Sequence, residues 1–317
     1  MNNEKLHQIM YECYGISAKK IEIINRFFLR QSYMIFDSTS WVVFKKYPPY
    51  FGEEHLKNIW MFTSALNQYG IRTMEVLEMK DGSFLYQDFG SYYVAYKYIE
   101  GNVMKPEDSF EVGKILKKFH NVSKKISYKR YETFEKQICV EQIIDDIQKF
   151  GQYREKSAVA KKIYNNIELF LRCIKEYRML DNIIIHGDFT LNNILYCGDE
   201  KRIIDLDSAR YGNIIEDLAC FTLSLLYTDG ENFELLPRYK EINDFIMGYY
   251  LDSDIPKNIV NELCKNLKAH CTIELARQAK HFLIARRYPG NEEYIGMLAD
   301  VVITKADILM EQLRSYF

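Results

Sequence analysis

Apolar runs rich in β-branched and aromatic residues alternate with polar turn signals over the first hundred positions, which is typical of short β-strands. Strands are expected at residues 21–24, 32–36, 41–45, 75–79, 83–87 and 92–98. Residues 37–40, Asp-Ser-Thr-Ser, favour a turn, so the second and third strands should form a hairpin. From about residue 53 to residue 69, apolar side chains recur every three or four positions, which predicts one helix that ends at Gly70.

The pattern becomes helical after Gly101, where Pro and Gly are scarce. Helices are expected from Asp108 or Ser109 to His120, at 135–150, at 158–176 and from residue 217 onward. Short strands at 183–185, 194–196 and 202–204 interrupt them, and the last two strands bracket a turn. The change of pattern predicts two domains, an N-terminal lobe at 1–100 and a C-terminal lobe at 101–317.

Length and charge limit the function classes. A chain of 317 residues is long enough for two lobes. Its net charge of −2 supplies no positive field for nucleic acid, so we expect no nucleic-acid partner. No apolar stretch is long enough to cross a membrane and the N-terminus does not resemble a signal peptide, which favours a cytoplasmic protein. The seven cysteines show no C-x-x-C pair and are read as reduced thiols.

The chemistry concentrates in two segments, His186-Gly187-Asp188-Phe-Thr-Leu-Asn-Asn193 and Ile204-Asp205-Leu-Asp207. Phosphoryl transfer needs a group that orients a hydroxyl and groups that hold Mg²⁺ against the phosphates. Asp188 can accept the hydroxyl proton, while Asn193 and Asp205 offer the hard oxygen atoms that magnesium prefers. Because a hairpin is expected between the two segments, these three residues are predicted to converge as the catalytic set. Turn and capping roles are the alternative reading.

These segments resemble the H-G-D-x-x-x-x-N and I-D-x-D motifs of the aminoglycoside phosphotransferase and choline kinase superfamily. Gly212 followed by Asp217-Leu-Ala resembles a further family segment, in which the Asp begins a buried helix and steadies the catalytic loop. The resemblance also suggests that His186 braces this loop, although a satisfied structural histidine is the reading we favour. Asp207 either binds a second metal ion or accepts backbone hydrogen bonds. Within the superfamily, the pattern is most similar to the spore-coat protein S group.

The resemblance implies an α+β, bilobal protein-kinase-like fold, with a small antiparallel-sheet N-lobe carrying one helix and a larger, mainly helical C-lobe. The N-lobe should bind ATP or GTP. Lys45 is the expected phosphate-binding lysine, although it can equally be the solvated end of an edge strand. Its carboxylate partner is expected to be Glu54 in the first helical turn, where the helix dipole alone also favours acidic residues.

Residues 93–101 resemble the hinge of the family, which would place the Lys97 carbonyl and the Ile99 amide at the adenine edge; an ordinary core strand is the alternative. The turn after residue 24 departs from kinases because it contains no glycine to let backbone amides approach the phosphates. Arg26, Arg30, Gln31 or Ser32 would then contact phosphate instead.

The leading hypothesis is a Mg²⁺-dependent phosphotransferase, a kinase that moves the γ-phosphoryl of ATP or GTP to the hydroxyl of a small acceptor of the aminoglycoside, choline, sugar or amino-alcohol type. No long activation segment follows Asp205, which argues against protein substrates. The alternative is a weak or inactive kinase-like structural protein, such as a spore-coat component, which the glycine-free turn favours. The sequence does not indicate an oligomeric state.

Overall fold

The structure, a computed structural model, describes residues 3–27, 30–127, 140–177, 183–226, 236, 238–285 and 289–317. The chain forms two compact units. The first contains Met1–Val103 and Ile194–Asp207, and the second contains Met104–Lys129, Glu135–Asn193 and Ser208–Phe317. The division into lobes at 1–100 and 101–317 stays a prediction. The units differ from it in one respect, because Ile194–Asp207 packs with the first unit.

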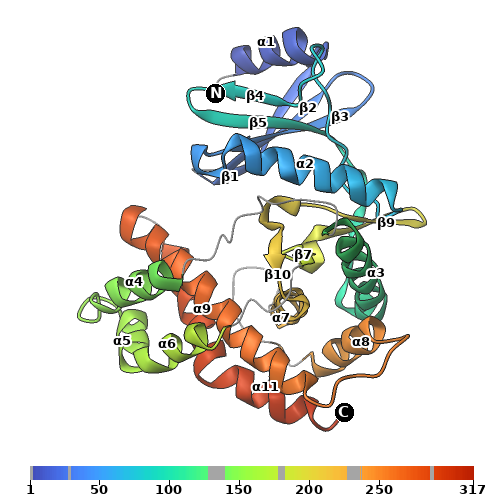
Figure 1. The fold of residues 1–317 in the computed structure, drawn as a ribbon. Helices are drawn as coiled ribbons and strands as arrows, with labels where there is room; N and C mark the ends of the chain where they lie inside the picture. Colours follow the sequence, from blue (N-terminus) through green and yellow to red (C-terminus); the bar gives the residue numbers. More distant parts are fainter. Residues whose placement is uncertain are drawn as a thin grey trace. The chain divides into compact units, whose positions relative to one another are not determined.

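A five-stranded antiparallel sheet forms the centre of the first unit, with strand order β1-β2-β3-β5-β4 (Figure 1). Its strands are β1 (Lys20–Phe27), β2 (Arg30–Phe36), β3 (Trp41–Tyr47), β4 (Leu85–Asp88) and β5 (Ser91–Lys97). The central strand β3 pairs with β2 and β5, and in this register Ser32 and Val94 are the neighbours of Lys45. The helix predicted at 53–69 is confirmed as α2 (Glu53–Gln68).

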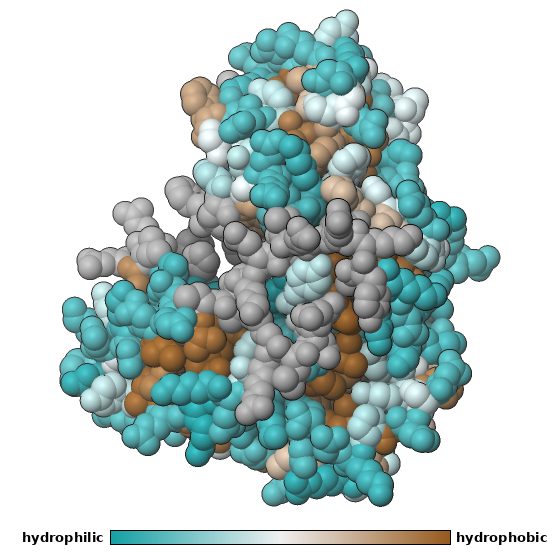
Figure 2. Space-filling model, in the orientation of Figure 1, coloured by the Kyte–Doolittle hydropathy of each residue, from teal (hydrophilic) through white to brown (hydrophobic). Residues whose placement is uncertain are grey.

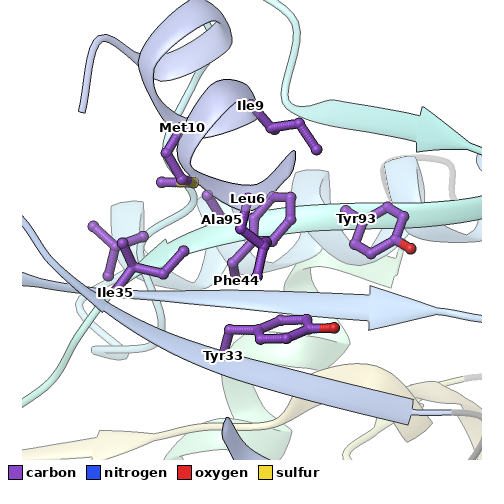
Figure 3. Close-up of a cluster of buried hydrophobic side chains, with 9 residues drawn as sticks. Leu6, Ile9, Met10, Tyr33, Ile35, Phe44, Tyr93 and Ala95 are labelled. Carbon is purple, nitrogen blue, oxygen red and sulfur yellow. The ribbon is translucent and has the colours of Figure 1, made fainter. Parts of the chain in front are cut away.

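A second helix, α1 (Asn3–Tyr14), also belongs to this unit, so the expectation of a single helix was wrong. Its buried side chains Leu6, Ile9 and Met10, with the partly buried Cys13, recur at spacings of three and four, a helical pattern that escaped the sequence analysis. The three side chains point toward Phe44 and Ala95 on the sheet (Figure 3). Alpha-helix α1 therefore covers one face of the sheet.

The strand expected at 75–79 was also wrong, since this segment makes only an isolated bridge between Val76 and Tyr96. It is nevertheless extended beside β5, where the Lys97 N–H donates to the Glu75 carbonyl at 2.9 Å and the Leu77 N–H donates to the Ala95 carbonyl at 2.8 Å. Because β4 pairs with only the first half of β5, the segment 75–77 occupies the remaining edge.

A three-stranded sheet of order β6-β8-β9 completes the first unit. Its strands are β6 (Asn102–Val103), β8 (Ile194–Cys197) and β9 (Glu200–Ile203), which confirms the predicted hairpin. The Ile203 N–H donates to the Arg72 carbonyl at 2.9 Å, which ties the hairpin to the chain before β4. This attachment places the residues that follow β9 beside the main sheet.

Helices dominate the second unit. They are α3 (Ser109–Ser127), α4 (Val140–Gly151), α5 (Ala158–Asn165), α6 (Ile167–Lys175), α7 (Ile214–Leu225), α8 (Tyr239–Tyr249), α9 (Ile259–Ala285), α10 (Pro289–Asp300) and α11 (Ala306–Leu313). The helix predicted at 158–176 is broken at Asn166, which ends α5 and precedes α6. Residues 135–139 of another predicted helix lie outside the described residues. A two-stranded sheet joins β7 (Ile183–Ile185) to β10 (Arg210–Gly212).

Helix α7 is the buried centre of this unit, because nine of its twelve residues are inaccessible to solvent. Helices α3 and α8 pack backbone to backbone: a Cβ at Gly113 would lie 2.2 Å from the Phe245 carbonyl oxygen, and a Cβ at Gly248 would lie 2.0 Å from that of Phe110. Only glycine permits this approach, which brings the end of α8 against the first turns of α3.

The surface in Figure 2 is mainly hydrophilic, with hydrophobic side chains gathered in a few patches. Within the described residues, no helix is both long enough and apolar enough to cross a bilayer.

Candidate active site

A tight turn after β7 carries the first predicted motif. Gly187 has φ of +77°, and a Cβ there would lie 2.3 Å from both the Arg210 Nη1 and the Ser208 carbonyl oxygen. A side chain is therefore excluded by conformation and by space. The turn leads directly to Asp188. It is held by the backbone N–H of Asp188, which donates to His186 Nδ1 at 3.3 Å.

Asp217, at the start of α7, anchors this turn. Its carboxylate accepts hydrogen bonds from the backbone N–H groups of His186 at 2.9 Å and Gly187 at 2.8 Å, and it contacts His120 Nε2 at 3.0 Å. The side chain is fully buried. Burial acts to raise the Asp217 pKa, but the hydrogen bonds from His120 and from the His186 backbone outweigh it, so the pKa lies below the ordinary value. A carboxylate that is ionised at neutral pH therefore holds the loop.

Asn193 ends the same loop, in the 3-10 turn Leu191–Asn193. Its Nδ2 donates to the Asp188 carbonyl at 2.8 Å and lies 3.4 Å from Asp188 Oδ2. The structure thus brings the proposed base and the proposed amide ligand together. Because the amide nitrogen is used in this contact, the amide oxygen is the atom suited to a cation.

Within the second unit, a buried ion pair supports the strand that packs against this loop. Arg210 Nη2 lies 2.6 Å from Glu216 Oε2, and both side chains are about 6% exposed or less. Glu216 Oε1 also accepts from the backbone N–H of Asn213, the residue that caps α7. These contacts fix β10 to the start of the helix that carries Asp217.

The first unit contains the second group of predicted residues. Lys45 Nζ lies 2.8 Å from Asp205 Oδ1 and 2.5 Å from Asp207 Oδ2. Burial acts to lower the Lys45 pKa, but the two carboxylates outweigh it and hold the pKa above the ordinary value. The lysine is therefore a fixed ammonium and not the solvated end of an edge strand.

Asp205 adopts φ of +60°, a left-handed conformation that is uncommon for a residue with a side chain. Its backbone N–H is directed at the Met74 sulfur, 3.5 Å away. Backbone strain of this kind persists where the surrounding structure imposes it, and it concentrates at functional sites. The conformation supports a functional role for the Asp205 carboxylate.

The remaining predicted nucleotide contacts occupy separate places. Glu54 is exposed on α2, and the carboxylates that hold Lys45 are Asp205 and Asp207, so the expected pairing of Lys45 with Glu54 was wrong.

Ser32 lies opposite Lys45 on the neighbouring strand, which keeps it a candidate for phosphate contact. The turn between β1 and β2, with residues 28 and 29, and the side chains of Arg26 and Arg30 lie outside the described residues. Lys97 is the last residue of β5, and Ile99 follows where the chain leaves the sheet. The adenine contacts assigned to their backbone groups stay a prediction.

Two tyrosines beside Lys45 escaped the sequence analysis. Tyr47 Oη donates to Asp207 Oδ1 at 2.8 Å and lies 2.8 Å from Tyr96 Oη. The sequence contained a signal for Tyr47: side chains of a strand alternate between its two faces, and Tyr47 stands two residues after Lys45, on the same face. The buried side chains of His120 and Tyr249 extend the support of Asp217, because the Tyr249 hydroxyl lies 2.9 Å from His120 Nδ1.

The carboxylate oxygens of Asp205 and Asp207 are of the hard kind that magnesium prefers. In the part of the chain that the structure describes, no three His, Cys, Asp or Glu side chains gather as a metal site. Two carboxylates, those of Asp205 and Asp207, nevertheless converge on one cation, the Lys45 ammonium. Asn193, in the second unit, offers an amide oxygen of the same hard character.

Comparison with known proteins identifies the family. The sequence pattern described as "Phosphotransferase enzyme family" matches residues 28–243, which is more than half of the chain. The chain therefore belongs to the phosphotransferase enzyme family. A curated relative, the probable bifunctional tRNA threonylcarbamoyladenosine biosynthesis protein of Methanosphaera stadtmanae, is 29% identical over 124 residues. That alignment covers 39% of this chain and 22% of the relative, so the chain spans about a fifth of that protein.

Three solved structures share the fold over nearly the whole chain. A spectinomycin phosphotransferase in complex with ADP and spectinomycin is 15% identical, covers 99% of both chains and gives a TM-score of 0.66. An amicoumacin kinase in complex with AMP-PNP and Ca²⁺ is 13% identical over 95% of this chain and 93% of its own, with a TM-score of 0.70. A microcompartment-associated aminopropanol kinase is 14% identical over 98% and 99%, also with a TM-score of 0.70. The chain thus has the α+β, protein-kinase-like fold predicted from its sequence, with a small antiparallel sheet and a larger helical part.

Proposed function

We propose that this protein is an ATP- or GTP-dependent phosphotransferase that phosphorylates a hydroxyl group of a small molecule. The observation that carries the proposal is the loop on Asp217, which holds the backbone of His186 and Gly187 and so presents Asp188 with Asn193 beside it. Membership of the phosphotransferase enzyme family supports the reaction class. The protein forms no covalent bond in this reaction. Its main task is to place charged groups around the reacting phosphate.

Asp188 acts as the base in this proposal. Its carboxylate accepts the proton of the acceptor hydroxyl while the hydroxyl oxygen forms a bond to the γ-phosphorus. The bond between that phosphorus and the β–γ bridging oxygen breaks, ADP or GDP leaves, and Asp188 passes the proton to water. Asn193 and Asp205 would hold Mg²⁺, which offsets the charge of the phosphates when it is bound.

The nucleotide belongs to the first unit. Lys45 supplies a fixed positive charge for the α- and β-phosphates, Ser32 lies on the neighbouring strand, and Lys97 and Ile99 would contact adenine through their backbone groups. The related fold has been solved with ADP, AMP-PNP and GDP, which supports nucleotide binding but leaves the choice between ATP and GTP to experiment.

The acceptor belongs to a chemical class rather than to one compound. Structural neighbours include kinases of spectinomycin, aminopropanol and ethanolamine. Each of those names denotes a small hydroxylated molecule that also carries nitrogen. We therefore propose an amino alcohol or aminated sugar as the acceptor, and a cytoplasmic place of action where ATP and Mg²⁺ are available.

A thermal-shift experiment tests whether the protein binds nucleotide together with metal. The melting temperature of the wild-type protein should rise with ATP and Mg²⁺ together, because ligand that binds only the folded state stabilises it. Asp205→Ala should abolish the metal-dependent part of the rise. If the melting temperature of the wild type does not rise, the proposal of an active enzyme is contradicted, and the alternative of a kinase-like structural protein is favoured. Acceptors can then be screened by ADP release.

A further inference from the structure

The carboxylate partner of the phosphate-binding lysine comes from an unexpected part of the chain. Lys45 is 14% exposed and pairs with Asp207 Oδ2 at 2.5 Å, while Glu54 on α2 is exposed. Lys45 is separated in sequence by 160 residues from Asp205 and by 162 from Asp207. Helix α2 therefore does not supply the partner of the lysine in this chain.

Asp207 is held on both of its oxygen atoms. Oδ2 contacts the Lys45 ammonium, and Oδ1 accepts a hydrogen bond from Tyr47 Oη, which in turn lies 2.8 Å from Tyr96 Oη. The Asp207 side chain is 1% exposed, and both tyrosines are buried. A buried carboxylate with fixed partners on both oxygens is rigid, since moving it would strand charge in an apolar interior.

The strand geometry makes this arrangement specific. Tyr47 and Lys45 lie two residues apart on β3, so their side chains share one face of the sheet. Tyr96 lies on β5, the strand paired with β3, and points to the same face, where it meets α2 residues. Two neighbouring strands thus form a chain of two hydroxyl groups, of which only that of Tyr47 contacts the carboxylate.

Asp205 also contacts Lys45, through Oδ1 at 2.8 Å, but it differs from Asp207 in burial and in backbone conformation. Its side chain is 38% exposed and its backbone is in the left-handed region. A partly exposed carboxylate is suited to a cation that enters and leaves with the substrate, whereas a buried carboxylate with a partner on each oxygen is not. Asp205 is therefore suited to the metal ion, and Asp207 is suited to hold Lys45.

We infer that Tyr47 and Tyr96 form a relay that positions Asp207 as the dedicated partner of Lys45, in place of a carboxylate from α2. Asp207 and both tyrosines are positioning residues: they orient the lysine toward the phosphates and leave Asp205 for the metal. The inference rests on the proposed function, because it needs Lys45 to bind phosphate.

Nucleotide affinity measured without metal tests the relay. ATP binding is followed with a fluorescent ATP analogue in EDTA and then in Mg²⁺, and steady-state constants are measured with the acceptor found by ADP release. Tyr47→Phe should weaken metal-free binding about tenfold and raise the KM for ATP similarly, because it removes a hydrogen bond to a charged group. The value of kcat should change far less. Tyr96→Phe, one step further away, should show a smaller effect in the same direction.

Tyr93→Phe is the matched control. Tyr93 is buried on β5 but lies in the cluster under α1, stacked on Phe44. It should leave the affinity for ATP unchanged, and melting curves should show that all variants are folded. The double variant Tyr47→Phe with Asp207→Asn should bind no more weakly than Asp207→Asn alone, because the tyrosine acts through the aspartate.

Two results would overturn the inference while leaving the proposed function intact. One is a Tyr47→Phe protein that binds ATP as Tyr93→Phe does. The other is a double variant whose loss of affinity is the product of the two single losses. A wild-type protein that binds no ATP would instead overturn the proposed function, and the relay with it.

Discussion

Asp217 Oδ1 accepts a hydrogen bond from the backbone N–H of Gly187 at 2.8 Å, across thirty residues of sequence. The residue just before the proposed base is thus held by a buried carboxylate at the start of α7. Asp188 lies outside the helices and strands, and this contact fixes the backbone just before it. Asp217 therefore anchors the loop that contains His186 and Gly187.

Gly187→Ala should destabilise the protein strongly. The substitution places a side chain in a left-handed conformation and drives it into Arg210 and Ser208, which together should cost about 3 kcal/mol or more. Gly198→Ala is the control, since its φ is +65° but a Cβ there has no neighbour within 4 Å. That control should cost only about 1 kcal/mol. Urea denaturation measures both, and equal losses would show that the close approach does not matter.

Asp217→Asn should lower stability by about 3 kcal/mol near neutral pH, because an ionised acceptor of three hydrogen bonds is lost. The Asp217 pKa lies below its ordinary value of 3.8. A depressed pKa stabilises the fold above the unfolded pKa, and this contribution is lost as the pH falls through the folded pKa. The difference in unfolding free energy between wild type and variant should therefore shrink below about pH 4. A difference that stays constant with pH would contradict this account.

Asp188→Asn should abolish turnover while leaving the nucleotide site intact. Loss of a general base should lower kcat roughly 10²- to 10⁴-fold. Affinity for ATP, measured by calorimetry, should change less than about twofold, because Lys45 and its partners belong to the other compact unit. Near-normal turnover would show that Asp188 is not the base.

Leu6→Ala should destabilise the first unit by about 2–5 kcal/mol, since Leu6 is fully buried beneath α1. His7→Ala, at the exposed neighbouring position of the same helix, should change stability by less than about 0.5 kcal/mol. Thermal unfolding separates the two. Similar effects would mean that α1 does not contribute its apolar face to the sheet.

The sequence predicts best those features that are local. The loop from His186 to Asn193 spans eight residues, so its motif could be read directly, and the strand around Lys45 was evident from its apolar run. The α1 helix is also a local feature and was missed, although Leu6, Ile9, Met10 and Cys13 recur at the spacings of three and four that indicate a helix.

Long-range partners were beyond such reasoning. The pairing of Lys45 with Asp207 joins residues 162 positions apart, and nothing in either segment alone distinguishes it from a pairing with Glu54. Tyr47 was within reach through strand alternation, but its target was not. Pairing across that distance is determined by how β9 attaches to the chain near Arg72, which only the folded structure shows.

The first unit is assembled from two distant stretches of chain, because β6 pairs with β8 through Asn102 and Tyr196. During synthesis, a nascent chain that has reached residue 103 lacks the hairpin and both carboxylates that neutralise Lys45. The ribosome must add about a hundred more residues before this ammonium finds its partners, which makes unit completion a late event in folding. An isolated fragment that ends at residue 103 would keep the sheet but carry an uncompensated charge on its face.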